Sequence, residues 1–309
     1  MLFLTEDDVR ALLPMTDAIR LMRDVFSALA SGHAQNQSRR RLVLPTGAAL
    51  HSMAGAHGPY FGTKIYSTHP KHGMTFHFHL YDSATARPLA LMEANWLGQI
   101  RTGAASGLAT ELLARDGAAS VAVIGSGFQA RSQLEAVRAV RKIRVARVWS
   151  RDAEKRRRFG KEMAAETCHT AEAAVHGADI VITATNAKEP VLEHEWVATG
   201  AHVNAMGSNQ ARRRELPAAL IERAALVAVD SIEQSRYEAG DLLMALAELA
   251  SPPNVVELSD VVAGRAGRRG SLEITIFKSC GIGVEDVAAG GFVYERALAE
   301  GVGRKFQSP

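Results

Sequence analysis

Hydrophobic positions in the first third of the chain follow a helical spacing and then an extended one. Residues 5–30 predict two short helices, and the second has an apolar face formed by Ile19, Met22, Val25, Phe26 and Leu29. Thr5 and Asp8 have the spacing of a capping box, and Thr16 is expected to cap the second helix. Between residues 41 and 93, the segments "RLVLP", "YFGTKIYS", "MTFHFHLYD" and "PLALME" predict strands, and the following residues 95–115 predict a helix.

Strand–helix alternation begins at Ala118. Buried strands are predicted at residues 121–124, 145–149, 180–183, 202–205 and 226–229, with helices at 128–140, 152–166 and 241–250. Such alternation is typical of a parallel sheet. A last helix at 284–301 is expected to return to the first domain. The predicted fold class is therefore α/β, a Rossmann-type doubly wound parallel sheet with a smaller α+β domain.

The turn Gly125-Ser126-Gly127-Phe128-Gln129-Ala130 separates the strand at 121–124 from the helix at 128–140. In a G-x-G-x-x-A turn, the first glycine permits the bend and the second lets the backbone approach a diphosphate. The third small residue keeps the helix close to the strand, and the helix N-terminus attracts the anion. All six residues are therefore predicted to bind a dinucleotide, and Thr185 is added to the predicted cofactor contacts.

The end of the second strand indicates which dinucleotide is preferred. NAD-binding domains place an acid there for the ribose hydroxyls, but this chain has Ser150 and Arg151. A guanidinium can form a fork of hydrogen bonds with a 2′-phosphate, so NADP(H) is the expected cofactor, with NAD(H) as the alternative. A shift of one residue would instead bring Asp152 to the ribose. Lys155 and Arg156 are expected on a solvated helix face.

Composition narrows the class of protein. The 309 residues have a net charge of +3 and contain no apolar run long enough for a membrane span, so neither nucleic acid nor a membrane is an expected partner. Two cysteines are too few for a disulfide framework, and the acidic N-terminus is unlike a signal peptide, so a cytoplasmic protein is expected. No metal is expected, although four histidines gather at His69, His72, His77 and His79.

Several longer segments resemble one known family. The segments "TKIYSTHP", "PLALMEANWLGQIRTGAASGLAT", "VAVIGSGFQA", "HVNAMGS" and "EITIFKSCGIGVED" are similar to the ornithine cyclodeaminase/mu-crystallin family, in the family's order and over almost the whole chain. The resemblance implies a substrate-binding and dimerisation domain at 1–115 with 290–309, and an NAD(P)-binding Rossmann domain at 116–289. It also implies a homodimer and a small amino or imino acid carboxylate as ligand.

The resemblance also implies a set of substrate residues. Arg41, which precedes the "LVLP" strand, and Arg101 of "RTGA" match arginines that can grip a carboxylate, although Arg39 and Arg40 compete with Arg41 for this role. Lys64 of "GTK" matches a lysine that can move a proton at an imine nitrogen.

Two further residues are placed near the reaction. Lys278, with Ser279, matches a loop at the nicotinamide end, so Lys278 is counted among the cofactor contacts. Asp230 is a candidate catalytic acid, and capping of a strand end is its alternative role.

One departure from the family separates the candidate functions. Cyclodeaminases have an aspartate where this chain has Asn209, and an amide cannot accept a proton or balance a distal ammonium. With Arg151, this substitution favours an NADP-dependent oxidoreductase that reduces a ketimine or cyclic imine such as pyrroline-2-carboxylate, with Asn209 near the substrate. The alternatives are an NAD-dependent ornithine cyclodeaminase and a non-catalytic, crystallin-like NADPH-binding protein. The substrate side chain and the direction of the reaction stay open.

Overall fold

The computed structural model describes residues 1–306 and divides into two compact units. Unit 1 comprises Met1–Arg101 and Gly281–Pro309, and unit 2 comprises Thr102–Cys280. Along the sequence, the boundaries between the units fall at 101/102 and 280/281, whereas 115/116 and 289/290 were expected. Helix α3 (Asn95–Leu113) contributes most of its length to unit 2, where Gly103 lies against the backbone of Ser132. Helix α11 (Gly283–Glu300) belongs to unit 1 from its first turn.

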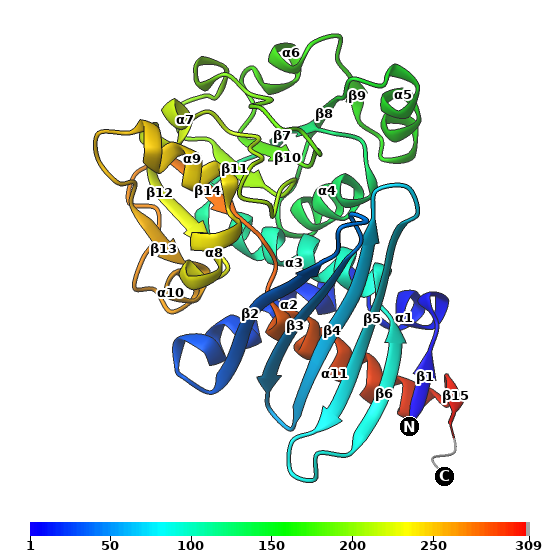
Figure 1. Cartoon of the computed structure of the whole chain (residues 1–309). Coiled ribbons are helices and arrows are strands. Elements are labelled where there is room, and N and C mark those ends of the chain that lie inside the picture. Colours follow the sequence, from blue (N-terminus) through cyan, green and yellow to red (C-terminus); the bar gives the residue numbers. More distant parts are fainter. Residues whose placement is uncertain (307–309) are drawn as a thin grey trace. The chain divides into compact units, whose positions relative to one another are not determined.

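Unit 1 is built on a seven-stranded sheet in the order β15-β1-β6-β5-β4-β3-β2. Its strands are β1 (Leu2–Leu4), β2 (Ala34–Val43), β3 (Ala49–His57), β4 (Tyr60–His69), β5 (Gly73–Asp82), β6 (Pro88–Glu93) and β15 (Arg304–Lys305). Strands β2–β6 form an antiparallel meander, and β1 pairs in parallel with β6. Helix α11 lies across one face of this meander (Figure 1). The sequence did not predict β3, because its segment "ALHSMAGAH" is dominated by small and polar residues.

The first two helices show where capping rules succeed and fail. Helix α1 (Glu6–Leu12) begins with the predicted capping box between Thr5 and Asp8, which is confirmed. The prediction that Thr16 caps the second helix is wrong, because α2 (Met15–Ala30) has its N-cap two residues earlier, at Pro14, whose backbone is extended. A proline is well suited to a helix start because its fixed φ and missing N–H cost nothing there.

Unit 2 contains an eight-stranded, all-parallel sheet in the order β13-β12-β14-β11-β10-β7-β8-β9. Its strands are β7 (Ser120–Ile124), β8 (Val145–Trp149), β9 (Glu166–Thr167), β10 (Ile180–Thr183), β11 (His202–Ala205), β12 (Ala224–Val229), β13 (Val255–Glu257) and β14 (Ile274–Lys278). Its helices are α4 (Phe128–Val140), α5 (Ala153–Glu162), α6 (Ala171–Val175), α7 (Ala218–Arg223), α8 (Ile232–Glu238), α9 (Gly240–Glu248) and α10 (Leu258–Val262), with a 3-10 turn at His194–Trp196.

The apolar runs of unit 2 follow from helices that cover both faces of the sheet. In β7, Val121 and Val123 face one buried cluster, whereas Ala122 and Ile124 face another. Strands that are buried on both faces read as continuous hydrophobic runs, which explains why the predicted strands 180–183 and 202–205 are confirmed. The predicted helix 128–140 and strand 145–149 are confirmed as well. Strand β14 was missed, and Lys278 is its last residue rather than part of a loop.

No helix within residues 1–306 has the length and apolar character needed to cross a membrane.

Candidate active site

The turn after β7 has the local geometry of a phosphate-binding turn. Gly125 has φ +115°, and a Cβ atom there would overlap the carbonyl oxygen of Ala184, so only glycine fits. A Cβ atom on Gly127 would instead meet nothing within 4 Å, which leaves an open cradle beside the backbone. Ala130 is fully buried, as a close helix–strand contact requires.

The start of α4 is suited to an anion. No side chain caps this 13-residue helix, and its first turn contains no acidic residue. Its positive end is therefore not neutralised by a local carboxylate. Together with the open cradle at Gly127, this fits the diphosphate of a dinucleotide.

The end of β8 has the predicted register. The carbonyl oxygen of Trp149 accepts the N–H of Gly125 at 2.8 Å, and the hydroxyls of Ser126 and Ser150 are 2.9 Å apart. The Asp152 carboxylate accepts the N–H groups of residues 154 and 155 at 3.1 and 3.0 Å, so it caps α5. Ser150 and the exposed Arg151 are therefore the residues that follow the strand, and the ribose role for Asp152 has no support in this geometry.

Two arginines reinforce this corner of unit 2. Arg131 donates to the carbonyl oxygens of Ser126 and Gly127 at 3.3 and 3.0 Å, which ties the turn to the first turns of α4. Arg156 is half-buried and donates to the carbonyl oxygen of Ser150 at 3.0 Å. The expectation that Arg156 lies on a solvated helix face is therefore wrong, since its side chain turns back to the strand end.

In unit 1, two cations and two carboxylates form a buried cluster. Lys64 on β4 is 3% exposed, and its Nζ lies 2.9 and 2.7 Å from the two carboxylate oxygens of Asp286. Arg101 on α3 donates from Nε to Asp286 at 3.0 Å and from a terminal nitrogen to Glu285 at 2.5 Å. Both acids lie in the first turn of α11 and are fully buried. Sequence reasoning missed them, although adjacent acids at the start of an otherwise apolar helix are a signal that could have revealed them.

The cluster sets the acidity of Lys64. The pKa of Lys64 is lowered from its ordinary value to about 8, chiefly by burial and then by Arg101 and Arg39, while Asp286 opposes the shift. A lysine with this pKa exchanges protons readily near neutral pH. The two cations and two carboxylates balance each other, so these four residues contribute no net positive charge to the sheet face.

Two arginines of β2 add positive charge to this sheet face. Strand alternation places Arg41 beside His51 and Tyr66 on the same sheet face as Lys64, whereas Arg40 pairs with Ser52 on the opposite face. A bulge between residues 37 and 40 lets Arg39 join the first face as well. Its guanidinium contacts the sulfur of Met53 and the carbonyl oxygen of Gly281 at 3.3 and 3.2 Å. Two of the three candidate arginines therefore share the face of Lys64.

His51 is a further polar group on that face. It is 8% exposed and stacks on Tyr66 with ring centroids 4.2 Å apart, and its Nε2 is 3.0 Å from the hydroxyl of Thr68. Burial, together with Arg41 and Arg39, lowers the pKa of His51 to about 4, so the ring is neutral near pH 7. Within residues 1–306 its Nδ1 has no hydrogen-bond partner.

The remaining predicted residues of unit 2 lie at the carboxyl ends of neighbouring strands. Asp230 accepts from the hydroxyl of Ser279 and the N–H of Cys280 at 2.9 and 2.6 Å, which joins the ends of β12 and β14. Thr185 donates to the Glu215 carboxylate, and Lys278 donates to the carbonyl oxygen of Ser208. Asn209 is the next residue after Ser208. The catalytic and binding roles given to these residues stay predictions.

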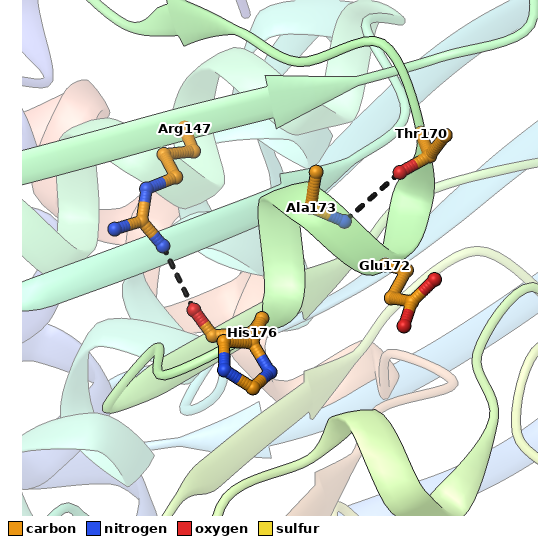
Figure 2. Close-up of a pocket in the computed structure, with 5 residues that line it drawn as sticks. All are labelled: Arg147, Thr170, Glu172, Ala173 and His176. Carbon is orange, nitrogen blue, oxygen red and sulfur yellow. Dashed lines mark hydrogen bonds between the residues drawn. The ribbon is translucent and has the colours of Figure 1, made fainter.

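A surface depression elsewhere in unit 2 contains none of the predicted residues. It is lined by Arg147, Thr170, Glu172, Ala173 and His176 (Figure 2). Arg147 donates to the carbonyl oxygen of His176 at 2.9 Å, and Thr170 caps α6 through the N–H of Ala173. These polar groups are occupied by local structure. No group of three or more potential metal ligands occurs within residues 1–306, the part that the structure describes.

Comparison with known proteins identifies the family of this chain. Residues 1–301 match the ornithine cyclodeaminase/mu-crystallin family. The chain belongs to this family.

Two kinds of relative are informative. The Δ1-pyrroline-2-carboxylate reductase of Bacillus cereus is 41% identical over 239 residues, which cover 74% of this chain and 73% of the relative. The structure of the Thermococcus litoralis Δ1-pyrroline-2-carboxylate reductase in complex with NADH and L-proline is 33% identical, with a TM-score of 0.93 and coverage of 99% and 100%. An archaeal alanine dehydrogenase dimer with bound NAD is 31% identical, with a TM-score of 0.93 and coverage of 99% of both chains.

Proposed function

We propose that this family member is an NAD(P)H-dependent reductase of cyclic imino acids, which converts a substrate such as pyrroline-2-carboxylate to the corresponding amino acid. The observation on which the proposal depends is Lys64, a buried lysine with a pKa near 8 whose sheet face also presents Arg39 and Arg41. The Bacillus cereus and Thermococcus litoralis relatives, whose names give this reaction, support the substrate class.

Different residues of unit 1 are proposed to bind the substrate carboxylate and to transfer the proton. Arg39 and Arg41 supply the positive charge that attracts the substrate carboxylate, and charge-assisted bonds of this kind contribute about 1.5–3 kcal/mol each. The Lys64 ammonium holds or donates the proton at the imine nitrogen. Asp286 keeps enough of Lys64 protonated to serve as the acid, and Glu285 and Asp286 fix the direction of Arg101.

Unit 2 is proposed to hold the dinucleotide. The 125–130 turn and the start of α4 would bind its diphosphate, and a reduced nicotinamide, when bound, supplies the hydride that the imine carbon receives. We propose NADP(H) as the preferred form, because Ser150 and Arg151 follow β8 and Asp152 is engaged in capping α5. The archaeal and Thermococcus relatives bind NAD or NADH, so the preference is a property to be tested on this chain.

A homodimer through unit 1 is part of the proposal. Leu42 and Leu50 face each other across β2 and β3 on the sheet face opposite Lys64, and they are 62% and 49% exposed. Val43, Leu44 and Met74 are also exposed. Exposed apolar groups of this kind favour an interface, and the alanine dehydrogenase relative is a dimer. Light scattering should give a dimer mass for the native chain and a monomer mass for Leu42→Glu.

We also place the protein in the cytoplasm, because both cysteines are free.

Turnover of an imino acid tests the function. Purified protein with NADPH and pyrroline-2-carboxylate should lose nicotinamide absorbance and form proline in equal amounts. Ornithine with catalytic NAD should release no ammonia, because Asn209 cannot serve a distal ammonium. Tight NADPH binding without turnover of any cyclic or linear imino acid would contradict the proposal and favour a binding protein.

Exchange of Arg151 tests the cofactor preference. Arg151→Ala should raise the Kd of NADPH about 10- to 100-fold while the Kd of NADH changes little, because only the 2′-phosphate would lose its partner. Arg157→Ala, on the exposed face of α5, is the matched control. Equal losses of affinity for the two dinucleotides would overturn the preference.

A further inference from the structure

A second charged cluster is buried in unit 2, and the proposed reaction gives it no role. Its centre is Glu215, a fully buried residue in the segment between β11 and α7. One carboxylate oxygen accepts the N–H and the hydroxyl of Thr185, both at 2.7 Å. The other accepts the hydroxyl of Thr183 at 2.8 Å and the N–H of Gly207 at 2.7 Å. Four donors therefore converge on a single carboxylate.

Lys278 and Asp241 extend this cluster. The Nζ of Lys278 lies 2.9 Å from the Asp241 carboxylate and donates to the carbonyl oxygen of Ser208 at 2.6 Å. Asp241 in turn accepts the backbone N–H groups of Glu215 and Leu216 at 2.6 and 2.9 Å. The cluster is closed on itself, so Lys278 is already engaged by protein groups.

The cluster joins three adjacent strands of the sheet at their carboxyl ends. Thr183 ends β10 and Thr185 follows it, Gly207 and Ser208 follow β11, and Lys278 ends β14. These strands are neighbours in the order β14-β11-β10-β7. Gly207 is required for this junction, because a Cβ there would overlap the carboxylate of Glu215. In doubly wound sheets, a ligand binds at the carboxyl ends of the strands. The 125–130 turn and Arg151 lie at β7 and β8, so the cluster lies on the opposite side of β7 from the residues assigned to the adenosine half.

We propose that Glu215, Asp241 and Lys278 are positioning residues for the nicotinamide half of the dinucleotide. They act through Thr185 and the 207–209 segment, which they hold in place, and not by contact with the cofactor. Lys278 then holds the backbone of Ser208 by a hydrogen bond and does not bind the cofactor itself. This bond also fixes the position of the following residue, Asn209. This inference rests on the proposed function, because it requires a nicotinamide dinucleotide.

The two accepting oxygens of Glu215 are the feature that the proposal needs. Glutamine has the same shape, but its NH₂ group would face two donors where the carboxylate oxygen accepts them. Glu215→Gln should therefore displace either Thr185 or Gly207 while the rest of the sheet stays packed. Thr183→Val removes one of the four donors without a change of volume, so it should have the same effect to a smaller degree.

Two ligands that differ by the nicotinamide half provide the test. Calorimetry would measure the Kd of NADPH and of adenosine 2′,5′-bisphosphate, which lacks the nicotinamide, for the native chain and for each variant. Glu215→Gln should raise the Kd of NADPH by about tenfold or more, and the Kd of the bisphosphate should stay within about twofold. Thr183→Val should raise only the NADPH value, by a few-fold. Glu222→Gln, at an exposed position in α7, is the matched control and should change neither value.

The outcomes separate this inference from the proposed function. Equal losses for both ligands would mean general damage to unit 2, and unchanged NADPH affinity in both Glu215→Gln and Thr183→Val would mean a purely structural cluster. Either result overturns the positioning role. If Glu215→Gln does not fold, Thr183→Val decides the matter by the same criterion. If the native chain binds neither NADPH nor NADH, the proposed function itself is wrong and this inference falls with it.

Discussion

Each unit of this protein buries a lysine against an aspartate, yet the two lysines differ in acidity. Burial lowers the pKa of Lys64 to about 8, and Arg101 and Arg39 strengthen the effect against the opposition of Asp286. Burial would lower the pKa of Lys278 too, but Asp241, Cys280 and Glu215 raise it above its ordinary value. Burial and neighbouring arginines thus make Lys64 more acidic, whereas neighbouring carboxylates make Lys278 less acidic than an ordinary lysine.

The comparison teaches that a buried lysine is not by itself evidence for catalysis. Both residues are at most 3% exposed, and both lie within 3 Å of a carboxylate oxygen. What distinguishes them is the sign of the surrounding charge. We therefore expect removal of Lys64 to affect mainly activity, and removal of Lys278 to affect mainly stability and cofactor placement.

Removal of Lys64 should have the largest effect. Lys64→Met should lower kcat/KM for imine reduction by about 10²–10⁴-fold, which is the usual contribution of a general acid. The Kd of NADPH, measured by calorimetry, should stay within about twofold, because the substitution lies in unit 1. Activity within tenfold of the native value would show that Lys64 does not transfer the proton.

Removal of Lys278 should sharpen the contrast. Lys278→Met leaves Asp241 buried without its cation, and loss of one partner of a buried pair costs about 3–5 kcal/mol. Urea unfolding should show this loss in the free energy of unfolding. Lys155→Met is the control, because its pair with Asp152 is exposed and contributes under about 1 kcal/mol. If Lys278→Met is as stable as the native chain, the claim that Lys278 acts mainly through stability is wrong.

Removal of a single arginine from β2 should have a smaller effect. Arg41→Met should raise the KM of the imino acid about tenfold or more, through the loss of a charge-assisted bond to the carboxylate. Steady-state kinetics would measure this change. Arg40→Met, whose side chain lies on the other face of the sheet, should leave KM unchanged. Equal effects of the two substitutions would contradict the assignment of the substrate to the Lys64 face.

Local sequence signals predicted unit 2 better than unit 1, for physical reasons. A strand buried on both faces, such as β10, and a side-chain cap, such as Asp152, can each be recognised from a few adjacent residues. Strand β3 gave no such signal, because its small residues make room for α11; Gly55 lies directly against Val284. Strand β14 was missed even though it is fully buried, so periodicity does not explain every omission.

The candidate site was predicted only in part. Lys64, Arg41 and Arg101 were found through the family resemblance, but their partners were not. Asp286 is 222 positions from Lys64, and no local pattern pairs residues across that distance. Glu215 was missed for a similar reason, because its four donors come from the ends of two other strands.

The pH dependence of kcat/KM tests the role of Lys64 most directly. This quantity reports the free enzyme, so reduction should be at its plateau below pH 8, where Lys64 is protonated, and should fall as pH rises through about 8. Asp286→Asn removes a group that raises the pKa of Lys64 and should move this limb to lower pH, whereas Arg39→Gln removes a group that lowers it and should move the limb to higher pH. Any limb that belongs to the substrate should stay in place. Shifts in these opposite directions are the predicted result, and a limb that does not move in either variant would contradict the account.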